Sequence, residues 1–282
     1  MKKSQTIALI LAGLAAAAFL LWPVVTFDLA KLRAIRKFSS DGGRVLNCIP
    51  SSSVLKIPPA ATAPSYSIVQ PPGCEVGLPS SEFQREGANK VVFTNSMGLL
   101  VACFGTLDKT NFTRLVHETG CTNVWDFMSS AYGATVTGIS EQQNMRRLQQ
   151  YLALLLFKAT AAPVGFEHSW LQFDRGDFRG FISGDLAKDG KVAIEIYIEQ
   201  KDEFLDILIR QKAKTGEMSD VYHILSILTV KPDPLLSNSF SYIPMSIKCS
   251  DRFEFERELW QKKLTRYRRG RGRLRLELVS PP

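Results

Sequence analysis

The fold is decided by residues 166–199, FEHSWLQFDRGDFRGFISGDLAKDGKVAIEIYIE, where apolar residues change from a helical to a strand spacing. Residues 166–173 and 178–183 each predict a strand, because apolar side chains recur at every second position there. Residues 192–199 alternate in the same way, as expected for a half-buried strand. The segment therefore predicts a three-stranded antiparallel meander.

Helical spacing occurs on both sides of this meander. Helices are expected at residues 111–118, 124–132, 140–161, 202–214 and 219–228, and short buried strands at residues 90–93 and 98–104. Ser140 is expected to cap the longest helix, and Asp189-Gly190 predicts a hairpin turn before the last strand of the meander. The pattern defines an α+β fold, with helices packed on one face of a small antiparallel sheet.

A membrane anchor is predicted at the N-terminus. Residues 4–27 contain no charged side chain. A helix over residues 7–27 would be roughly 31 Å long, which is enough to cross a hydrocarbon core about 30 Å thick. Trp22 is placed as expected for a residue at the membrane interface. We therefore expect residues 1–27 to form a single transmembrane segment that contacts lipid through residues 6–27.

Two other interpretations of this segment remain open. Lys2 and Lys3 followed by an apolar stretch also occur in cleavable signal peptides, but the stretch is longer than usual and residues 21–25 lack the small residues of a cleavage site. The third interpretation is a buried core helix.

The orientation of the anchor follows from the flanking charges. Lys2 and Lys3 favour a cytoplasmic N-terminus, whereas the four basic residues that follow the span favour the reverse. These are Lys31, Arg33, Arg36 and Lys37. We expect the N-terminus inside and most of the chain in the periplasm, because a Met-Lys-Lys start is typical of bacterial export signals.

The anchor is followed by a connecting region at residues 28–79. Residues 28–44 predict an amphipathic helix, with Leu29, Leu32 and Ile35 on one face and a Ser/Asp/Gly cluster at its end.

Seven of the fourteen prolines lie in residues 50–79. Because proline disfavours helix, this region is not expected to be helical. They allow an extended stalk or an irregular wrap around the domain. The globular domain is expected at residues 80–282.

The net charge of +8 comes from one segment. Residues 262–275 hold eight basic side chains and no acidic one, and the rest of the chain is neutral. The eight are Lys262, Lys263, Arg266, Arg268, Arg269, Arg271, Arg273 and Arg275. This distribution argues against a nucleic-acid-binding surface over the whole protein. It is compatible with a solvated edge strand or with binding to anionic lipid headgroups.

The meander also carries the best candidates for acid–base chemistry, which are Glu167, His168, Asp174 and Asp185. Acidic residues at turns more often cap and solvate, so these candidates are weak. The chain has three histidines and none of the common metal-binding spacings, nucleophile elbows or glycine-rich phosphate loops. We predict no metal site and no cofactor.

Five cysteines are compatible with disulfides if the domain is exported. The candidate pairs are Cys48 with Cys74 and Cys103 with Cys121. Cys103 lies in an apolar run and could equally be a core residue.

These patterns together favour a membrane-anchored, periplasmic, non-catalytic protein that binds another protein, such as an envelope assembly factor, a secretion accessory or an immunity factor. An envelope hydrolase with its acid/His site on the meander is the first alternative. A cytoplasm-facing membrane protein with a lipid- or RNA-binding tail is the second.

Overall fold

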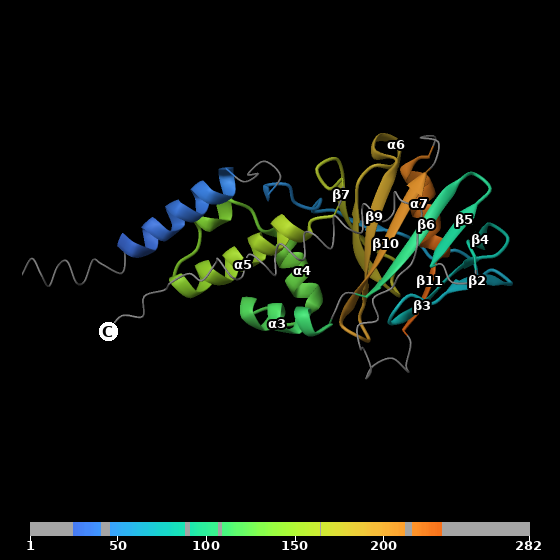
Figure 1. Cartoon of the computed structure of the whole chain (residues 1–282), viewed down its shortest axis with the longest axis horizontal. Helices are drawn as coiled ribbons and strands as arrows, with labels where there is room; N and C mark the ends of the chain where they lie inside the picture. Colours follow the sequence, from blue (N-terminus) through green and yellow to red (C-terminus); the bar gives the residue numbers. More distant parts are fainter. Residues whose placement is uncertain are drawn as a thin grey trace, which may run out of the picture.

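A computed structural model describes residues 25–40, 46–87, 91–106, 109–163, 165–211 and 216–232. These residues form an α+β structure, which confirms the predicted fold class. Figure 1 shows a large sheet with helices α3, α4 and α5 at one side and helix α7 at the other. The side chains of residues 106–111 lie outside the description.

The large sheet is mixed and has eight strands. Its order is β1 (Val54–Lys56), β7 (Trp170–Asp174), β8 (Arg179–Ser183), β9 (Lys191–Ile198), β10 (Glu203–Gln211), β6 (Leu99–Thr106), β5 (Val92–Asn95) and β4 (Phe83–Arg85). The predicted meander forms the adjacent strands β7, β8 and β9 of this sheet. All neighbouring strands of the sheet are antiparallel except β1 and β7. The sheet is therefore much larger than the meander alone.

The helix predicted at residues 202–214 is wrong, because this segment forms the central strand β10. Leu205 pairs with Ile196 of β9 on one side and with Thr106 of β6 on the other. Both faces of β10 are covered, so apolar residues occur at nearly every position and the strand period is obscured. The β-branched residues Ile207 and Ile209 suit this environment.

A short helix, α6 (Leu186–Asp189), stands where a hairpin turn was predicted. The Asp185 side chain accepts hydrogen bonds from the backbone N–H groups of Ala187 and Lys188, which caps the helix. Gly190 ends it with φ 66°, a left-handed conformation that favours glycine. The glycine therefore acts as a helix C-cap before β9.

The proline-rich segment is part of the folded structure, which corresponds to the wrap and not to a free stalk. A second sheet of three strands consists of β2 (Tyr66–Val69), β3 (Cys74–Pro79) and β11 (Thr229–Pro232), with β3 in the centre. Val76 and Leu78 on β3 are fully buried against the large sheet. β1 extends the edge of the large sheet.

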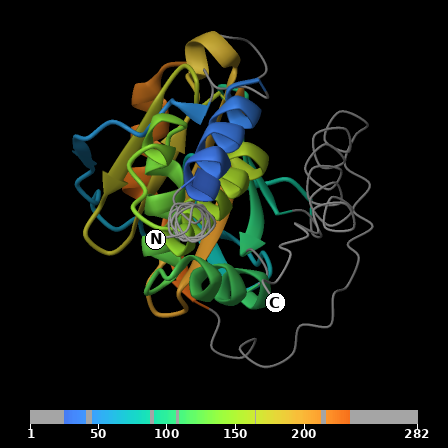
Figure 2. The same ribbon diagram turned by 90° about the vertical axis from the view of Figure 1, so that its left-hand side faces the viewer.

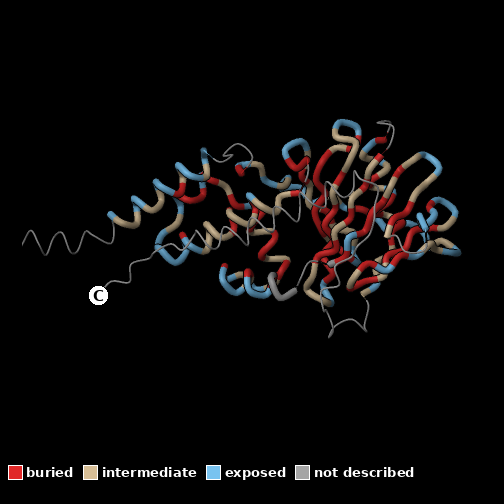
Figure 3. Tube along the Cα trace, viewed as in Figure 1, coloured by how far each residue is buried: buried red, intermediate tan, exposed pale blue. Residues whose placement is uncertain are grey.

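The two faces of the large sheet contact different elements. On one face, Ile194 and Ile196 pack against the three-stranded sheet and α7 (Met218–Ile227). On the other face, Phe181 and Tyr197 pack against α4 (Val124–Gly133) and its neighbouring helices. Figure 3 shows buried residues concentrated along the strands of the sheet. The sequence predicts all helices on one face of the sheet. This prediction is wrong, because helices pack on both faces.

Three predicted helices near the centre of the chain are confirmed, with adjusted boundaries. They are α3 (Lys109–Thr119), α4 and α5 (Met145–Ala161). Asn144, and not Ser140, caps α5, because the Asn144 side chain accepts a hydrogen bond from the N–H of Arg147. The residues before it form a 3₁₀ turn, η1 (Thr137–Ile139).

A helix also covers residues 25–40, as predicted, but its buried face differs from the predicted one. Phe27, Ala30, Ala34 and Phe38 pack into the core on the α4 side, whereas Leu29 and Leu32 are exposed. Figures 1 and 2 show that this helix lies beside α5, and that the two project from the sheet.

The predicted transmembrane segment lies almost wholly in residues 1–24, outside the described part of the chain. Among the helices that the structure describes, none has both the length and the apolar character needed to cross a bilayer.

Candidate functional site

The four acid–base candidates from the sequence divide between the two ends of the β7–β8 hairpin. His168 precedes β7 and Asp185 follows β8, so both lie at one end. Asp174 ends β7 and lies at the opposite end. A five-residue strand is about 16 Å long, which is too far for these groups to act on one substrate atom. Glu167 is exposed next to His168.

His168 contacts a carboxylate partner that the sequence did not indicate. Its Nδ1 lies 2.7 Å from Oδ1 of Asp189, at the end of α6. The His168 side chain is half exposed and that of Asp189 is largely buried. Asp189 Oδ2 also accepts a hydrogen bond from the N–H of Asp185, which orients the carboxylate. This His–Asp pair could support general base chemistry on a water molecule.

The other two candidates have clear structural roles. Asp185 caps α6, and the hydrogen bond from the N–H of Lys188 is the main reason that its pKa lies below its usual value. Asp174 accepts a hydrogen bond from Lys56 Nζ at 2.6 Å, and this bond lowers the pKa of Asp174. It thereby joins β1 to β7. The hydrogen bonds and ion pairs of these two carboxylates are made to residues other than His168.

A cluster of buried polar side chains, which sequence reasoning missed, lies between α4 and the sheet. Glu195 of β9 and Asp206 of β10 are cross-strand partners. The Tyr132 hydroxyl of α4 donates to Glu195 Oε1 at 2.7 Å. Burial raises the pKa of Glu195 well above its usual value and raises that of Asp206 to about 7. These two acids therefore favour the protonated form.

Four buried polar atoms in this region have no hydrogen-bond partner within the described part of the chain. They are Glu195 Oε2, Asp206 Oδ1, Ser129 Oγ and Trp170 Nε1. A buried polar group without a partner costs about 1–3 kcal/mol. Unpaired polar atoms of this kind are a local cost to the stability of the fold.

Lys158 of α5 completes the cluster. Its ammonium group donates to the carbonyl oxygens of Tyr132 at 2.9 Å, Ala134 at 2.7 Å and Cys48 at 2.6 Å. It also lies 5.4 Å from the centre of the Trp170 ring. Two of these carbonyls are at the C-terminus of α4, where a cation is favourable. Burial lowers the pKa of Lys158 to about 8.

The buried cluster is a structural network with acid–base properties, and the two cavities described below are lined by other residues. In the sequence, Glu195 appears on the polar face of a half-buried strand. Its partner Asp206 falls in a segment that was predicted to be helical. The only sequence signal for this cluster is an acidic residue in the middle of each segment, Glu195 in β9 and Asp206 in β10.

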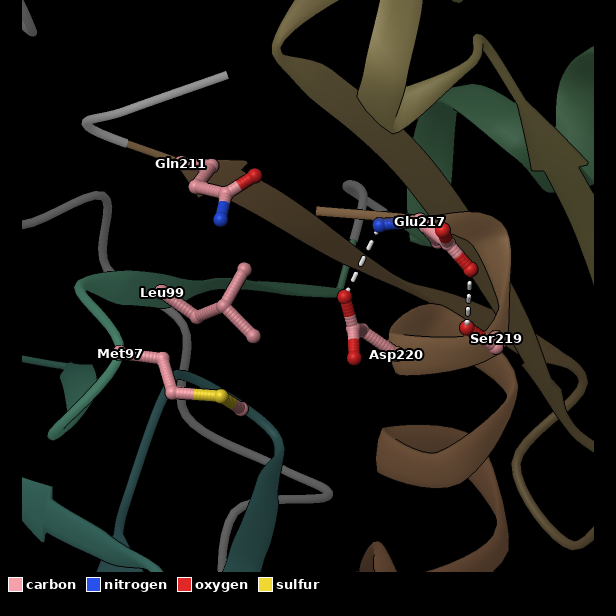
Figure 4. Close-up of a pocket in the computed structure, with 6 residues that line it drawn as sticks. All are labelled: Met97, Leu99, Gln211, Glu217, Ser219 and Asp220. Carbon is pink, nitrogen blue, oxygen red and sulfur yellow. Dashed lines mark hydrogen bonds between the residues drawn. The ribbon is translucent and has the colours of Figure 1, made fainter. Parts of the chain in front are cut away.

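The cavity in Figure 4 has a volume of about 390 Å³. Met97 and Leu99 line one side, and Glu217 and Asp220 line the other. The two acids cap the start of α7, because the Asp220 carboxylate accepts a hydrogen bond from the N–H of Glu217. Figure 4 also shows the Ser219 hydroxyl directed at Glu217. These acids stabilise a helix end.

A second hollow, of about 380 Å³, lies between the proline-rich segment and α7. Ile57, Pro58 and Tyr222 form part of its apolar lining. His223 at its edge pairs with Glu82 at 2.7 Å, and its side chain is about as exposed as that of His168, although Glu82 is more exposed than Asp189. The molecule thus has two surface histidine–carboxylate pairs, which provide a matched comparison.

The described cysteines lie in two cores on opposite faces of the large sheet. Cys74 and Cys103 are buried in the core beneath the three-stranded sheet. Cys48 and Cys121 pack against the core beneath α4. Cys103 and Cys121 are free thiols. Each candidate pair from the sequence therefore joins residues on opposite faces.

The eight basic residues of the C-terminal segment lie outside the described residues, as does most of the predicted lipid-contacting segment. Within the described ranges, no group of three or more His, Cys, Asp or Glu side chains is placed to hold a metal ion.

The fold and these sites define the chain as an α+β protein with a mixed eight-stranded sheet and a helical projection. No protein-family model, curated protein or solved structure matches it.

Proposed function

We propose that this chain is a membrane-anchored protein that presents a non-catalytic binding domain in the periplasm. The observation that carries the proposal is the position of helix 25–40. It begins within the last three residues of the uncharged segment 4–27, and it projects from the sheet beside α5. A projection of this kind would hold the sheet domain away from the bilayer and leave its surface accessible to a partner.

The arrangement of the acidic residues supports a binding role over a catalytic one. Asp185, Glu217 and Asp220 cap helices, and Asp174 forms an ion pair with Lys56. Groups that are engaged in this way are costly to recruit for proton transfer, because each change of charge would remove a stabilising contact.

The location is tested with two reporter fusions after Pro282. Alkaline phosphatase is active only in the periplasm, and a fluorescent protein that folds only in the cytoplasm serves as the matched control. We expect phosphatase activity and no fluorescence, with the full-length chain in the carbonate-washed membrane fraction. The reverse pattern would favour the cytoplasm-facing alternative, and a full-length chain in the soluble fraction would contradict both.

The binding role is tested by photo-crosslinking in intact cells. Ile68, Met97 and Phe104 are exposed apolar residues on the sheet domain, with 40%, 64% and 49% of their surfaces accessible. A photoreactive residue at each position should give a discrete protein adduct at one or more of them, whereas exposed Ser53 serves as the control. Identical adduct patterns at all four positions would indicate random collision and contradict the proposal.

The C-terminal basic segment is part of the same proposal, as a surface for anionic lipid. Replacing Arg268, Arg269, Arg271 and Arg273 with glutamine should weaken sedimentation with anionic vesicles. Binding that does not change would eliminate this role.

An envelope hydrolase is a second candidate function, and the His168–Asp189 pair is the observation that favours it. In this case His168 would remove a proton from water and Asp189 would orient its ring. The test is hydrolysis of chromogenic esters by the purified chain. His168→Gln should abolish activity and His223→Gln should not, since His223 is a similarly exposed histidine at a different site. Equal activity in both variants and the wild type would exclude this site.

A further inference from the structure

Helix 25–40 carries an apolar stripe on its outer face. Val25, Leu29 and Leu32 have 48%, 45% and 62% of their surfaces exposed. Their spacing of four and three residues places them on one side of the helix, and Arg36 continues the same line. The opposite side of the helix holds buried Ala34, together with Phe27 and Phe38, which pack against the core. Figure 3 shows the alternation of exposed and partly buried segments along this helix.

A helix with apolar residues on opposite sides needs a partner on each side. The inner side has the core, and the outer side faces solvent in the isolated chain. Exposing one apolar residue is ordinary, but an aligned row on one helix marks a surface that contacts something else.

The charges around this stripe indicate what that partner is. Arg33, Arg36 and Lys37 are exposed on helix 25–40, and Arg146 and Arg147 are exposed in the first turn of α5. Both segments lie toward the same end of the molecule in Figure 1. Lys31 donates to the carbonyl oxygen of Ser140 at 3.1 Å, which ties helix 25–40 to the loop before α5.

The basic residues outnumber the acidic ones in this region, where Asp28 and Glu141 are the nearby acids. Met145 adds a further exposed apolar side chain at the start of α5. Apolar side chains framed by arginine and lysine are typical of surfaces that lie in the interface of an anionic membrane.

The distance from the proposed anchor fits this environment. At 1.5 Å per residue, Leu29 and Leu32 lie about 3 Å and 8 Å beyond Phe27, the last residue of the predicted span. The headgroup region on each side of a bilayer is about 5–8 Å thick. Leu29 and Leu32 would therefore lie within the headgroup layer, with Val25 just inside the hydrocarbon boundary. The long arginine side chains that follow can extend back toward the phosphates.

We infer that the end of the helical projection, formed by residues 25–36 and 145–147, docks into the headgroup layer and binds anionic phospholipid. The inference rests on the proposed membrane anchoring and adds a second lipid contact to it. Apolar contacts and phosphate contacts together would fix the angle at which the sheet domain leaves the membrane.

The experiment uses the full-length chain in vesicles of phosphatidylcholine, with or without one third phosphatidylglycerol. A photoreactive residue replaces Leu29, Leu32 or, as the matched control, Met97. Met97 is 64% exposed but belongs to the β5–β6 turn at the other end of the molecule. Lipid adducts are quantified by mass spectrometry, and membrane integration is measured separately by resistance to carbonate extraction.

We expect at least about fivefold more lipid adduct at Leu29 and Leu32 than at Met97, and an increase at both positions when phosphatidylglycerol is added. Replacing Arg33, Arg36, Arg146 and Arg147 with glutamine should abolish that increase and leave carbonate resistance unchanged.

The outcomes separate this inference from the proposal on which it rests. A carbonate-resistant chain with equal adduct at all three positions would overturn the docking and leave the anchoring intact. Protein adducts at Leu29 in place of lipid adducts would overturn it as well, by assigning the stripe to a second copy or another protein. A chain that carbonate extracts would overturn the anchoring itself.

Discussion

The two faces of the large sheet are built from different chemistry. The face toward α7 and the three-stranded sheet is mostly aliphatic, with Ile194, Ile196 and Ile209 at its centre. The face toward α4 is aromatic and polar. Trp125 stacks on Phe181 at 5.1 Å between ring centres, and Glu195 and Lys158 are buried close by.

The two faces nevertheless share one feature. On each face, a basic side chain donates hydrogen bonds to the carbonyl oxygens at the C-terminus of a helix. Lys158 donates to carbonyls at the end of α4, and Arg175 donates to the carbonyls of Leu225 and Leu228 at the end of α7. Arg175 also pairs with Asp177. Lys158 has no carboxylate within ion-pair distance among the described residues.

The difference shows how one sheet can carry two kinds of interface. Aliphatic packing depends on volume and tolerates small shifts in position. A network of directed hydrogen bonds between α4, α5 and β9 tolerates few such shifts. Removing one partner leaves a buried polar group unpaired and lowers the stability of the fold. The α4 face should therefore be the one whose stability depends most on single polar groups and on pH.

The largest expected effect is that of Lys158→Met. Methionine keeps most of the side-chain volume but leaves three carbonyl oxygens without their donor. We expect the free energy of unfolding to fall by about 3–5 kcal/mol. The measurement is urea denaturation of the full-length chain in a mild detergent, followed by circular dichroism. Exposed Arg147→Met on the same helix is the control and should change stability by less than about 0.5 kcal/mol.

A loss below about 1 kcal/mol for Lys158→Met would contradict the contrast between the α7 face and the α4 face. It would mean that the α4 face is held by its aromatic packing and not by its polar network.

The second prediction concerns pH. The pKa of Asp206 is raised to about 7 by burial, against roughly 3.9 in the unfolded chain, so the folded state binds more protons between these values. Stability is therefore greatest at the acidic side of this window and falls as the pH rises through it. Glu195, whose pKa is also raised by burial, acts in the same direction.

Asp206→Asn should flatten this dependence. We expect the wild type to lose on the order of 2 kcal/mol more than the variant between pH 5 and pH 8, measured by denaturation at each pH. Ile194→Val on the opposite face is the control, because it lowers stability without changing the slope. If Asp206→Asn leaves the slope as steep as in the wild type, the acid pair does not titrate with folding.

Much of the fold follows from local sequence patterns, as α4, α5 and the β8–β9 pair show. In each case apolar side chains recur at the period of the element, although the cap of α5 and the connection from β8 to β9 differ from the prediction. The pattern of β10 misled because both of its faces are covered, so that the strand period disappears. Burial on two faces is decided by tertiary contacts, which no local window contains.

The candidate site was harder to predict for a related reason. His168 was singled out from its neighbourhood in the chain, but its partner Asp189 lies 21 residues further on and is oriented by a short helix that was not predicted. Glu195 and Asp206 meet only because β9 and β10 pair. The exposed side of helix 25–40 could not be told from its buried side, since both are apolar.

The third prediction tests the cap on the aliphatic face. Arg175→Gln removes donors to the end of α7 and the contact with the Phe178 ring, which lies 4.0 Å from the guanidinium carbon. We expect a loss of about 1–2 kcal/mol, smaller than for Lys158→Met because glutamine keeps an amide donor whereas methionine has none. Asp177→Asn is the control and should cost less, as the Asp177 side chain is 57% exposed. A greater loss for Asp177→Asn would show that the ion pair, and not the cap, matters here.

The smallest expected effect is that of replacing Lys56, an exposed lysine that can be compared with the buried Lys158. Lys56 Nζ lies 2.6 Å from Asp174 Oδ2, the same distance that separates Lys158 Nζ from the Cys48 carbonyl oxygen. The Lys56 side chain is 74% exposed, so water can replace its partner when the contact is lost. Lys56→Met should therefore lower stability by less than about 1 kcal/mol at neutral pH, in the denaturation assay used for Lys158→Met.

This exposed pair also has a pH dependence of opposite sign. The hydrogen bond from Lys56 lowers the pKa of Asp174, so its stabilising effect is present above the unfolded value near 4 and is lost as the pH falls below it. Wild type and Lys56→Met should converge in stability at low pH, whereas wild type and Asp206→Asn should diverge as the pH rises from 5 to 8. If the two lysine substitutions cost the same at neutral pH, then bond length and not burial controls the effect of a lysine here, and the contrast between an exposed edge and a buried polar face is lost.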